Sequence, residues 1–258
     1  MPSHTLPSLR HVIFGLALLA VALPVEAWDS CRFSAERRAN LDTAGVTRVV
    51  INARAGDLDV RPAAGGTLVA QGRACVSRES YLQQTDVNVR REGDTVHVDV
   101  QVPDELVGIG IFYATLDLVV ELPASLPVEI TDSSGDLEAR DVRVVKVTDS
   151  SGDIVLLRPQ SDVEIWDSSG DTRVEGAVGR VQVRDSSGDI VVAGAREVEI
   201  PSDSSGDIRI ERITGSVRIE QDSSGDIRVA DVGRDFTLLG DSSGEVHVSG
   251  VKGATRMP

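Results

Sequence analysis

The residues best placed to do chemistry are carboxylates that recur at a fixed interval in the second half of the chain. The sequence Asp-Ser-Ser-Gly-Asp first occurs at Asp132 and appears seven times, at steps of 17 to 19 residues, with Glu245 closing the last copy. A fixed period is typical of repeat architectures, in which equivalent residues of successive units lie above one another. The repeated carboxylates are therefore predicted to form two columns.

The first column would hold the Asp that opens each copy, and the second would hold the acidic residue that closes it. The opening residues are Asp132, Asp149, Asp167, Asp185, Asp203, Asp222 and Asp241. The closing residues are Asp136, Asp153, Asp171, Asp189, Asp207, Asp226 and Glu245. Like charges at the ~4.8 Å spacing of paired strands repel by about 1 kcal/mol in water, so something must offset this repulsion.

Several partners could stabilise the two columns. Each Asp could accept hydrogen bonds from backbone N–H groups of its own turn, with Ser hydroxyls bridging the coils. Alternatively, Ca²⁺ could lie between corners, held by carboxylate, hydroxyl and carbonyl oxygens of these 14 residues. The regular Ser columns also leave recognition of a ligand, a glycan or ice open. No other cofactor is expected.

Catalysis and nucleic-acid binding are both disfavoured. A catalytic group is normally unique, whereas these Asp and Ser residues occur seven times, with no long insertion between residues 132 and 250. Ser242, His247 and Asp241 could be written as a triad, but adjacency in sequence does not make one. The other candidate histidine, His97, is far away in the chain. The net charge of −15 has the wrong sign for binding phosphate.

The corners are expected to join short strands. Asp can accept turn N–H groups, and Gly adopts positive φ at no steric cost. Apolar residues alternate with polar ones on both sides of each corner, as in Val181/Val183 before and Ile190/Val192 after. A unit of ~18 residues is too short for a crossover helix, which needs roughly 30. Because two short strands cannot bury an apolar face alone, successive units must stack.

The predicted fold is therefore all-β: a single-stranded parallel β-solenoid with ~18-residue coils and irregular N-terminal β coils that act as a cap. Residues 28–114 are assigned to this cap and the irregular first coils, and residues 115–258 to the regular solenoid. Gly56-Asp57-Leu58-Asp59-Val60 resembles a degenerate repeat. The segments 87–89 and 96–100 predict a hairpin. Residues 106–114 are interpreted as a capping element or a mobile loop.

The N-terminal segment indicates export. Residues 1–27 resemble a signal peptide: basic residues precede an apolar run over 12–23, which is shorter than the ~20 residues of a membrane span. No later segment is apolar enough to cross a bilayer, so the protein is expected in the periplasm or at the cell surface. In such an oxidising compartment Cys31 and Cys75 predict a disulfide.

The other end of the chain begins a coil that it does not finish. Val246, Val248 and Val251 continue the apolar pattern, and Lys252 and Arg256 follow. Charges at a terminal edge discourage further pairing. The unfinished apolar coil nevertheless suggests the opposite hypothesis, that the end stacks on another molecule.

Three features together resemble the bacterial family of exported repeat proteins known as putative adhesins. They are the export signal, the segment 116–123 (Leu-Asp-Leu-Val-Val-Glu-Leu-Pro) and the repeated Ser-Gly-Asp-Ile-x-Val units, and the resemblance covers about residues 45–250. It implies a β-solenoid and surface attachment. The uniform corner and the cysteine pair are departures from the family pattern. The expected function is an exported structural or interaction module of the cell envelope with a protein or glycan partner, or alternatively a Ca²⁺-binding surface solenoid.

Overall fold

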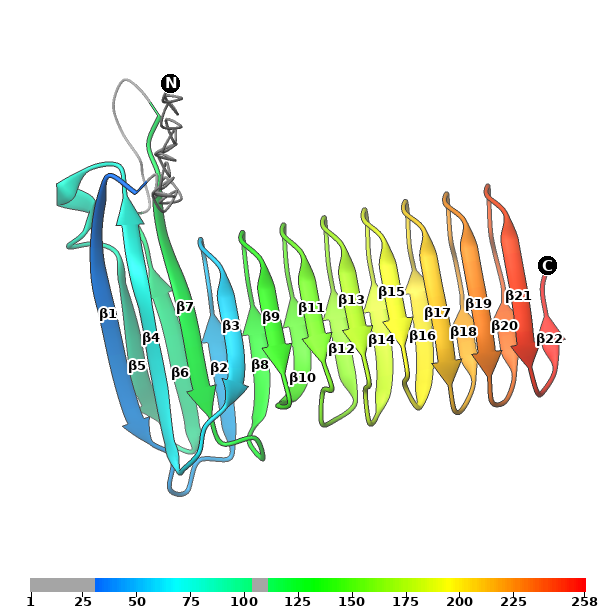
Figure 1. Ribbon diagram of the computed structural model, residues 1–258, viewed down its shortest axis with the longest axis horizontal. Coiled ribbons are helices and arrows are strands. Elements are labelled where there is room, and N and C mark those ends of the chain that lie inside the picture. Colours follow the sequence, from blue (N-terminus) through cyan, green and yellow to red (C-terminus); the bar gives the residue numbers. More distant parts are fainter. Residues whose placement is uncertain (1–30, 104–110) are drawn as a thin grey trace, which may run out of the picture. The chain divides into compact units, whose positions relative to one another are not determined.

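The computed structural model describes residues 31–103 and 111–258. The predicted signal peptide and residues 106–110 of the predicted capping segment lie outside these ranges. Cys31–Pro258 forms one compact unit, and its strands make two eleven-stranded sheets, called sheet A and sheet B (Figure 1). No helix in the described part is long and apolar enough to span a membrane.

Both sheets run from the N-terminal end of the stack to its C-terminal end. In spatial order, sheet A consists of β1 (Phe33–Asp42), β4 (Thr67–Val76), β7 (Ala114–Leu122), β3 (Leu58–Pro62), β9 (Leu137–Arg140), β11 (Ile154–Leu157), β13 (Thr172–Glu175), β15 (Ile190–Ala193), β17 (Ile208–Ile213), β19 (Ile227–Val232) and β21 (Val246–Val251). Sheet B consists of β5 (Asp86–Glu92), β6 (Thr95–Gln101), β2 (Arg48–Asn52), β8 (Pro127–Thr131), β10 (Arg143–Thr148), β12 (Val163–Trp166), β14 (Arg180–Arg184), β16 (Glu197–Ser202), β18 (Val217–Ile219), β20 (Phe236–Leu238) and β22 (Thr255–Arg256).

The regular part confirms the predicted parallel β-solenoid. From β8 onward each coil adds one strand to each sheet, and each strand pairs in parallel with the equivalent strand of the coil before it. Register is kept, so Ile190 of β15 pairs with Ile208 of β17, which pairs with Ile227 of β19. These residues have no exposed surface and form one apolar column between the sheets.

The order of coils in space differs from their order in the chain. Strands β2 and β3 form a coil that lies between the β6/β7 coil and the β8/β9 coil, although β6 and β7 come later in the sequence. Leu58, in the degenerate repeat, pairs with Leu118 on one side and Leu137 on the other. The degenerate repeat is therefore a full member of the stack.

Antiparallel strands close the N-terminal end. Strand β4 pairs with β1 and β7, and β5 and β6 form the predicted hairpin, with Gly93 at φ 64° in its turn. Arg37 of β1 reaches the other side of the end: its Nε donates to the Thr85 carbonyl at 2.8 Å, and Nη2 donates to the Leu82 carbonyl. The short 3₁₀ helix η1 (Glu79–Tyr81) precedes these acceptors.

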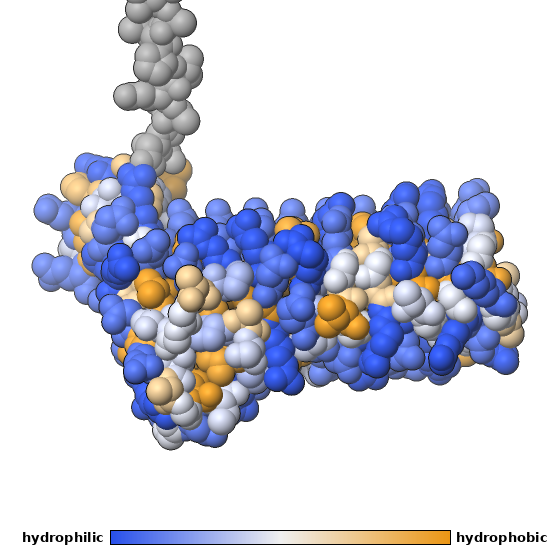
Figure 2. Space-filling model, turned by 60° about the horizontal axis from the view of Figure 1, so that its bottom comes forward, coloured by the Kyte–Doolittle hydropathy of each residue, from blue (hydrophilic) through white to orange (hydrophobic). Residues whose placement is uncertain are grey.

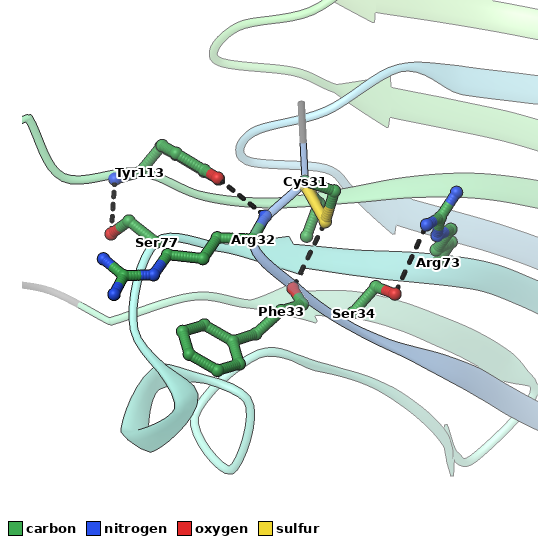
Figure 3. The surroundings of a disulfide bond; sticks show 8 residues. Cys31, Arg32, Phe33, Ser34, Arg73, Ser77 and Tyr113 are labelled. Atoms are coloured by element: carbon green, nitrogen blue, oxygen red, sulfur yellow. Dashed lines mark hydrogen bonds between the residues drawn. A yellow bond between two sulfur atoms is a disulfide. The ribbon is translucent and has the colours of Figure 1, made fainter. Parts of the chain in front are cut away.

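The predicted disulfide joins Cys31 to Cys75 of β4, with 5.4 Å between the Cα atoms (Figure 3). Beside it, the Tyr113 hydroxyl accepts the Arg32 N–H at 3.0 Å, and the Tyr113 N–H donates to Ser77 Oγ at 3.1 Å. The disulfide and the two hydrogen bonds hold the start of β1 against the ends of β4 and β7.

Candidate functional site at the acidic corners and outer faces

The seven corners stack in vertical register because glycine allows the backbones to touch. At Gly188 φ is 139°, and a Cβ atom there would lie 1.8 Å from the Gly170 carbonyl oxygen of the coil before. The equivalent glycines of the other corners have the same left-handed φ and the same close approach. Any side chain would push the coils apart, so this position requires glycine.

The closing acidic residues form an exposed hydrogen-bonded ladder. In each coil the backbone N–H of this residue donates to Oδ1 of its counterpart in the preceding coil, at 2.8 to 3.1 Å from Asp136 to Glu245. These carboxylates were expected to accept hydrogen bonds from N–H groups of their own turn, but they accept them from the next coil instead. The ladder also extends to Asp57 of the degenerate repeat and to Asp117, and the equivalence of Asp117 was not apparent from the sequence.

The opening Asp residues form a second, buried column. All but Asp241 have between 0 and 5 % of their surface exposed. Most of these carboxylates accept N–H groups of their own turn, as predicted; Asp185 Oδ1 accepts from Ser186 at 2.6 Å and from Ser187 at 3.1 Å. The carboxylates of Asp203 and Asp222 do not. The Ser hydroxyls bridge coils, as Ser187 Oγ does by donating to the Ser168 carbonyl at 3.2 Å.

Several carboxylate oxygens of this buried column have no hydrogen-bond partner. They are Oδ2 of Asp132, Asp149 and Asp185, and both oxygens of Asp203 and Asp222. Because the column runs through consecutive coils, each carboxylate between its two ends has another above and below it, and an isolated parallel β-bridge joins the backbones of Asp203 and Asp222. An ionised carboxylate without a partner is costly in such a place.

Burial therefore raises the pKa of these carboxyl groups. Loss of solvent is the first cause in every case, and it raises the pKa of Asp132, Asp167, Asp185 and Asp222 to about 6. For Asp203 the charges of Asp185 and Asp222 add to it, and the pKa reaches about 7. The column is thus built to hold protons in mildly acidic solution.

The fourteen residues predicted to hold Ca²⁺ do not form one set of ligands. The opening residues are buried beneath the corner, whereas the closing residues lie on its surface and bind the next coil. Across residues 31–103 and 111–258, no group of three or more His, Cys, Asp and Glu side chains is arranged to hold a metal ion. Protons fit the orphaned oxygens of the buried column better, and calcium binding stays a prediction for experiment.

The side chains of the hypothetical triad are not assembled in the described structure. His247 is exposed on β21, Asp241 belongs to the column of opening residues, and Ser242 is exposed at the corner. Within the described residues no hydrogen bond or ion pair joins any two of them. His97 lies on β6, near the opposite end of sheet B, where its Nε2 is 3.6 Å from Glu92.

The outer face of sheet B carries an exposed aromatic residue that the sequence patterns did not single out. Trp166, at the end of β12, is 45 % exposed. Its indole N–H donates to Glu164 Oε1 at 2.7 Å, and Arg184 Nη1 donates to the same oxygen at 2.8 Å. Lys146 Nζ and the Arg184 guanidinium each lie 5.1 Å from the ring centroid. The outward position of Trp166, one residue after buried Ile165, was the available signal.

Large hydrophobic side chains are also exposed at Ile111, Val178, Leu239 and Met257. The face seen in Figure 2 is mostly hydrophilic along the solenoid, and hydrophobic and neutral residues gather at its lower left. Many outer-face charges are paired, as Arg209 is with Glu211 at 3.1 Å and Arg228 with Asp226 at 2.6 Å. Paired surface charges of this kind add little binding energy.

Comparison with known proteins shows a likeness of fold. No family model matches the chain, and no curated protein matches it. Among solved structures, a putative lipid binding protein from Parabacteroides distasonis is 13 % identical with a TM-score of 0.52, covering 86 % of this chain and 97 % of its own. A putative adhesin from Bacteroides fragilis is 14 % identical with a TM-score of 0.48, covering 88 % and 98 %. A putative adhesin from Parabacteroides merdae is 12 % identical with a TM-score of 0.47, covering 87 % and 96 %.

The stacked strands and corners thus define a parallel β-solenoid, and the solved structure with a TM-score of 0.52 has a similar fold. At these identities the likeness concerns the fold alone. Functional statements must come from the chain's own residues.

Proposed function

We propose that this chain is an exported, non-catalytic interaction module of the adhesin-like kind, which binds a protein or glycan partner in the bacterial envelope. The observation that carries the proposal is the exposed indole of Trp166, held in one orientation by Glu164 and flanked by two cations. The proposed contact surface is the outer face of sheet B centred on Trp166.

The composition of this surface suits binding. Trp and Arg are the residues that most often dominate binding energy at interfaces, because they bury a large area and lose little freedom when they are already oriented. Trp166 is fixed before any partner arrives, since its N–H and its ring face are both engaged. No other aromatic side chain of the described residues is exposed, so the position is distinctive.

The local charge favours an acidic partner group. Lys146 and Arg184 flank the ring, and Glu164 accepts its indole N–H. Two cations thus lie beside the ring on a chain whose net charge is −15. Carboxylate, phosphate or sulfate groups of a partner would complement it, and Arg recognises such groups in a bidentate manner.

The covalent features are compatible with export. The Cys31–Cys75 disulfide suits an oxidising compartment, and the N-terminal segment resembles a signal peptide. The repeated corners support a structural role, because their Asp and Ser side chains join successive coils and their glycines let the backbones touch, so no unique reactive group is left.

The test is retention of the purified chain on isolated bacterial envelope. Trp166→Ala and Arg184→Ala should each lower the apparent affinity about tenfold or more, as expected for a hot-spot residue. Arg209→Ala, on the outer face of sheet A, is the matched control and should bind like the original chain. Protease treatment and periodate oxidation of the envelope distinguish a protein partner from a glycan.

Equal retention of Trp166→Ala and the original chain would refute this surface as the binding site. Absence of retention by the original chain would refute an envelope partner. Far-UV circular dichroism of each variant ensures that a loss of binding is not a loss of fold, which is not expected because the Trp166 side chain points outward from β12.

A further inference from the structure

The two ends of the solenoid are finished differently. At the N-terminal end β1 and β5 are the edge strands, and Arg37 ties them together through the Thr85 and Leu82 carbonyls and through Asp86 at 3.4 Å. Buried residues such as Val87 and Val100 complete the core beneath this closure. Arg37 lies across this end, where Ala39 and Leu41 of β1 and Val89 of β5 are partly buried against the core.

At the C-terminal end the apolar column is open. Val246, Val248 and Val251 are partly exposed, whereas their counterparts in the coil before, among them Ile227 and Val232, have no exposed surface. No strand of the described residues pairs with the outer edge of β21 in sheet A (Figure 1). An edge of this kind is a template for another strand.

The hydrogen-bonding groups at this end also lack their next coil. In the preceding coil the N–H groups of Asp222, Gly225 and Ile227 donate to carbonyls of the coil ahead, at 2.9 to 3.2 Å. Their equivalents are the N–H groups of Asp241, Gly244 and Val246, which face the open end. Unpaired N–H groups beside half-exposed valines make a surface that a further β strand would satisfy.

We propose that two copies of this chain associate through their C-terminal ends, tail to tail about a twofold axis. Head-to-tail stacking is disfavoured because the N-terminal end is closed. A twofold axis uses the same open surface on both copies and terminates at a dimer. It also sets β21 antiparallel to β21 of the other copy, which continues sheet A across the interface.

The charges at the open end fit this arrangement. Glu245 immediately precedes β21 and Lys252 immediately follows it, and both are exposed. When β21 pairs antiparallel with β21 of the second copy, Glu245 of each copy lies next to Lys252 of the other copy. Residues 246–258 contain Lys252 and Arg256 and no acidic residue. A parallel pairing of two C-terminal ends would therefore place like charges next to each other.

The experiment is sedimentation equilibrium of the full chain from micromolar to near-millimolar concentration. The mass should double as concentration rises. Glu245→Lys and Lys252→Glu should each weaken the dimer at least tenfold, and the double variant should restore it, because the pair is exchanged symmetrically. Arg38→Glu, an exposed reversal on β1 at the closed end, should leave the association unchanged.

A single monomer mass at every concentration would overturn the proposal. So would a double variant as weak as the single ones, or masses that grow beyond the dimer. Failure of a variant to fold cannot imitate the expected restoration. This interface is separate from the Trp166 surface. A chain that binds the envelope but stays monomeric would therefore refute the dimer and agree with the proposed function.

Discussion

Replacing Asp203 by Asn is predicted to remove a pH-dependent loss of stability that is built into the buried column. Asp203 is 1 % exposed, both its carboxylate oxygens lack partners, and burial together with the charges of Asp185 and Asp222 raises its pKa to about 7. Asn keeps the shape of the side chain but carries no charge at any pH.

The sign and size follow from the proton balance. An unfolded Asp titrates near pH ~3.9, so between about pH 4 and 7 the folded chain binds more protons than the unfolded chain, and stability falls as pH rises. About three pKa units at 1.36 kcal/mol each give about 4 kcal/mol for Asp203 taken alone. Asp185 and Asp222 interact with Asp203, so the three groups titrate together. The change in unfolding free energy due to Asp203 is then smaller than the value for an isolated group.

The assay is urea unfolding followed by far-UV circular dichroism at about pH 4.5, 6 and 8, chosen to bracket the raised pKa. Asp203→Asn should stabilise the fold at the highest pH by about 2 to 4 kcal/mol and much less at the lowest. Asp189→Asn, in the exposed ladder, is the matched control and should keep the pH slope of the original chain. A variant whose slope equals that of the original, or an original chain that gains stability toward pH 8, would refute the reasoning.

Three other predictions concern the corners, the cap and metal. Gly188→Ala should cost about 3 kcal/mol or more in unfolding measurements, because Cβ would overlap the Gly170 carbonyl at positive φ, whereas Gly66→Ala, with open space around it, should cost under about 1. Reducing the Cys31–Cys75 bond should lower stability by about 4 kcal/mol on the loop-entropy model, seen as a lower melting temperature with reductant; an unchanged melt would contradict it. Melts with EDTA and with millimolar CaCl₂ should coincide, and a rise with calcium would restore the metal hypothesis.

The solenoid itself could be predicted from the sequence because its period is explicit. Each corner carries the same Asp, Ser and Gly, and each strand alternates as Ile190 and Val192 do, so local patterns and stacking require the same fold. The disulfide was predictable for a similar reason: two cysteines beyond a predicted signal peptide leave one pairing.

The N-terminal coil order could not be predicted because it depends on which strands meet in space. Nothing in residues 48–62 says that β6 and β7 will later pair on one side of this coil while β8 and β9 pair on the other. The antiparallel pairs of β4 are long-range contacts of the same kind. Trp166 was missed because strand alternation alone treats an outward residue beside buried Ile165 like any other, although an outward Trp in a chain with 3% aromatic residues was the available signal.

The difference between the two acidic columns was also hidden from the sequence, and it changes what the corner does. Asp203 and Asp207 are four residues apart in one repeat and are the same residue type. Burial raises the pKa of Asp203, whereas the Asp226 N–H and then Arg228 lower the pKa of Asp207. The folding stability that depends on Asp203 falls as pH rises toward about 7. The stability contributed by Asp207 is lost only as pH falls below ~4.

Opposite pKa shifts in one corner restrict the pH range in which the solenoid is most stable against unfolding. The buried column is best satisfied when protonated, whereas Asp207 of the exposed ladder is best satisfied when ionised, because it accepts the Asp226 N–H and pairs with Arg228. Both conditions hold together only at about pH 4 to 5. We therefore expect a stability maximum there, more acidic than the usual range of ~5 to 8, and a maximum near neutral pH would mean that the buried oxygens have found another partner.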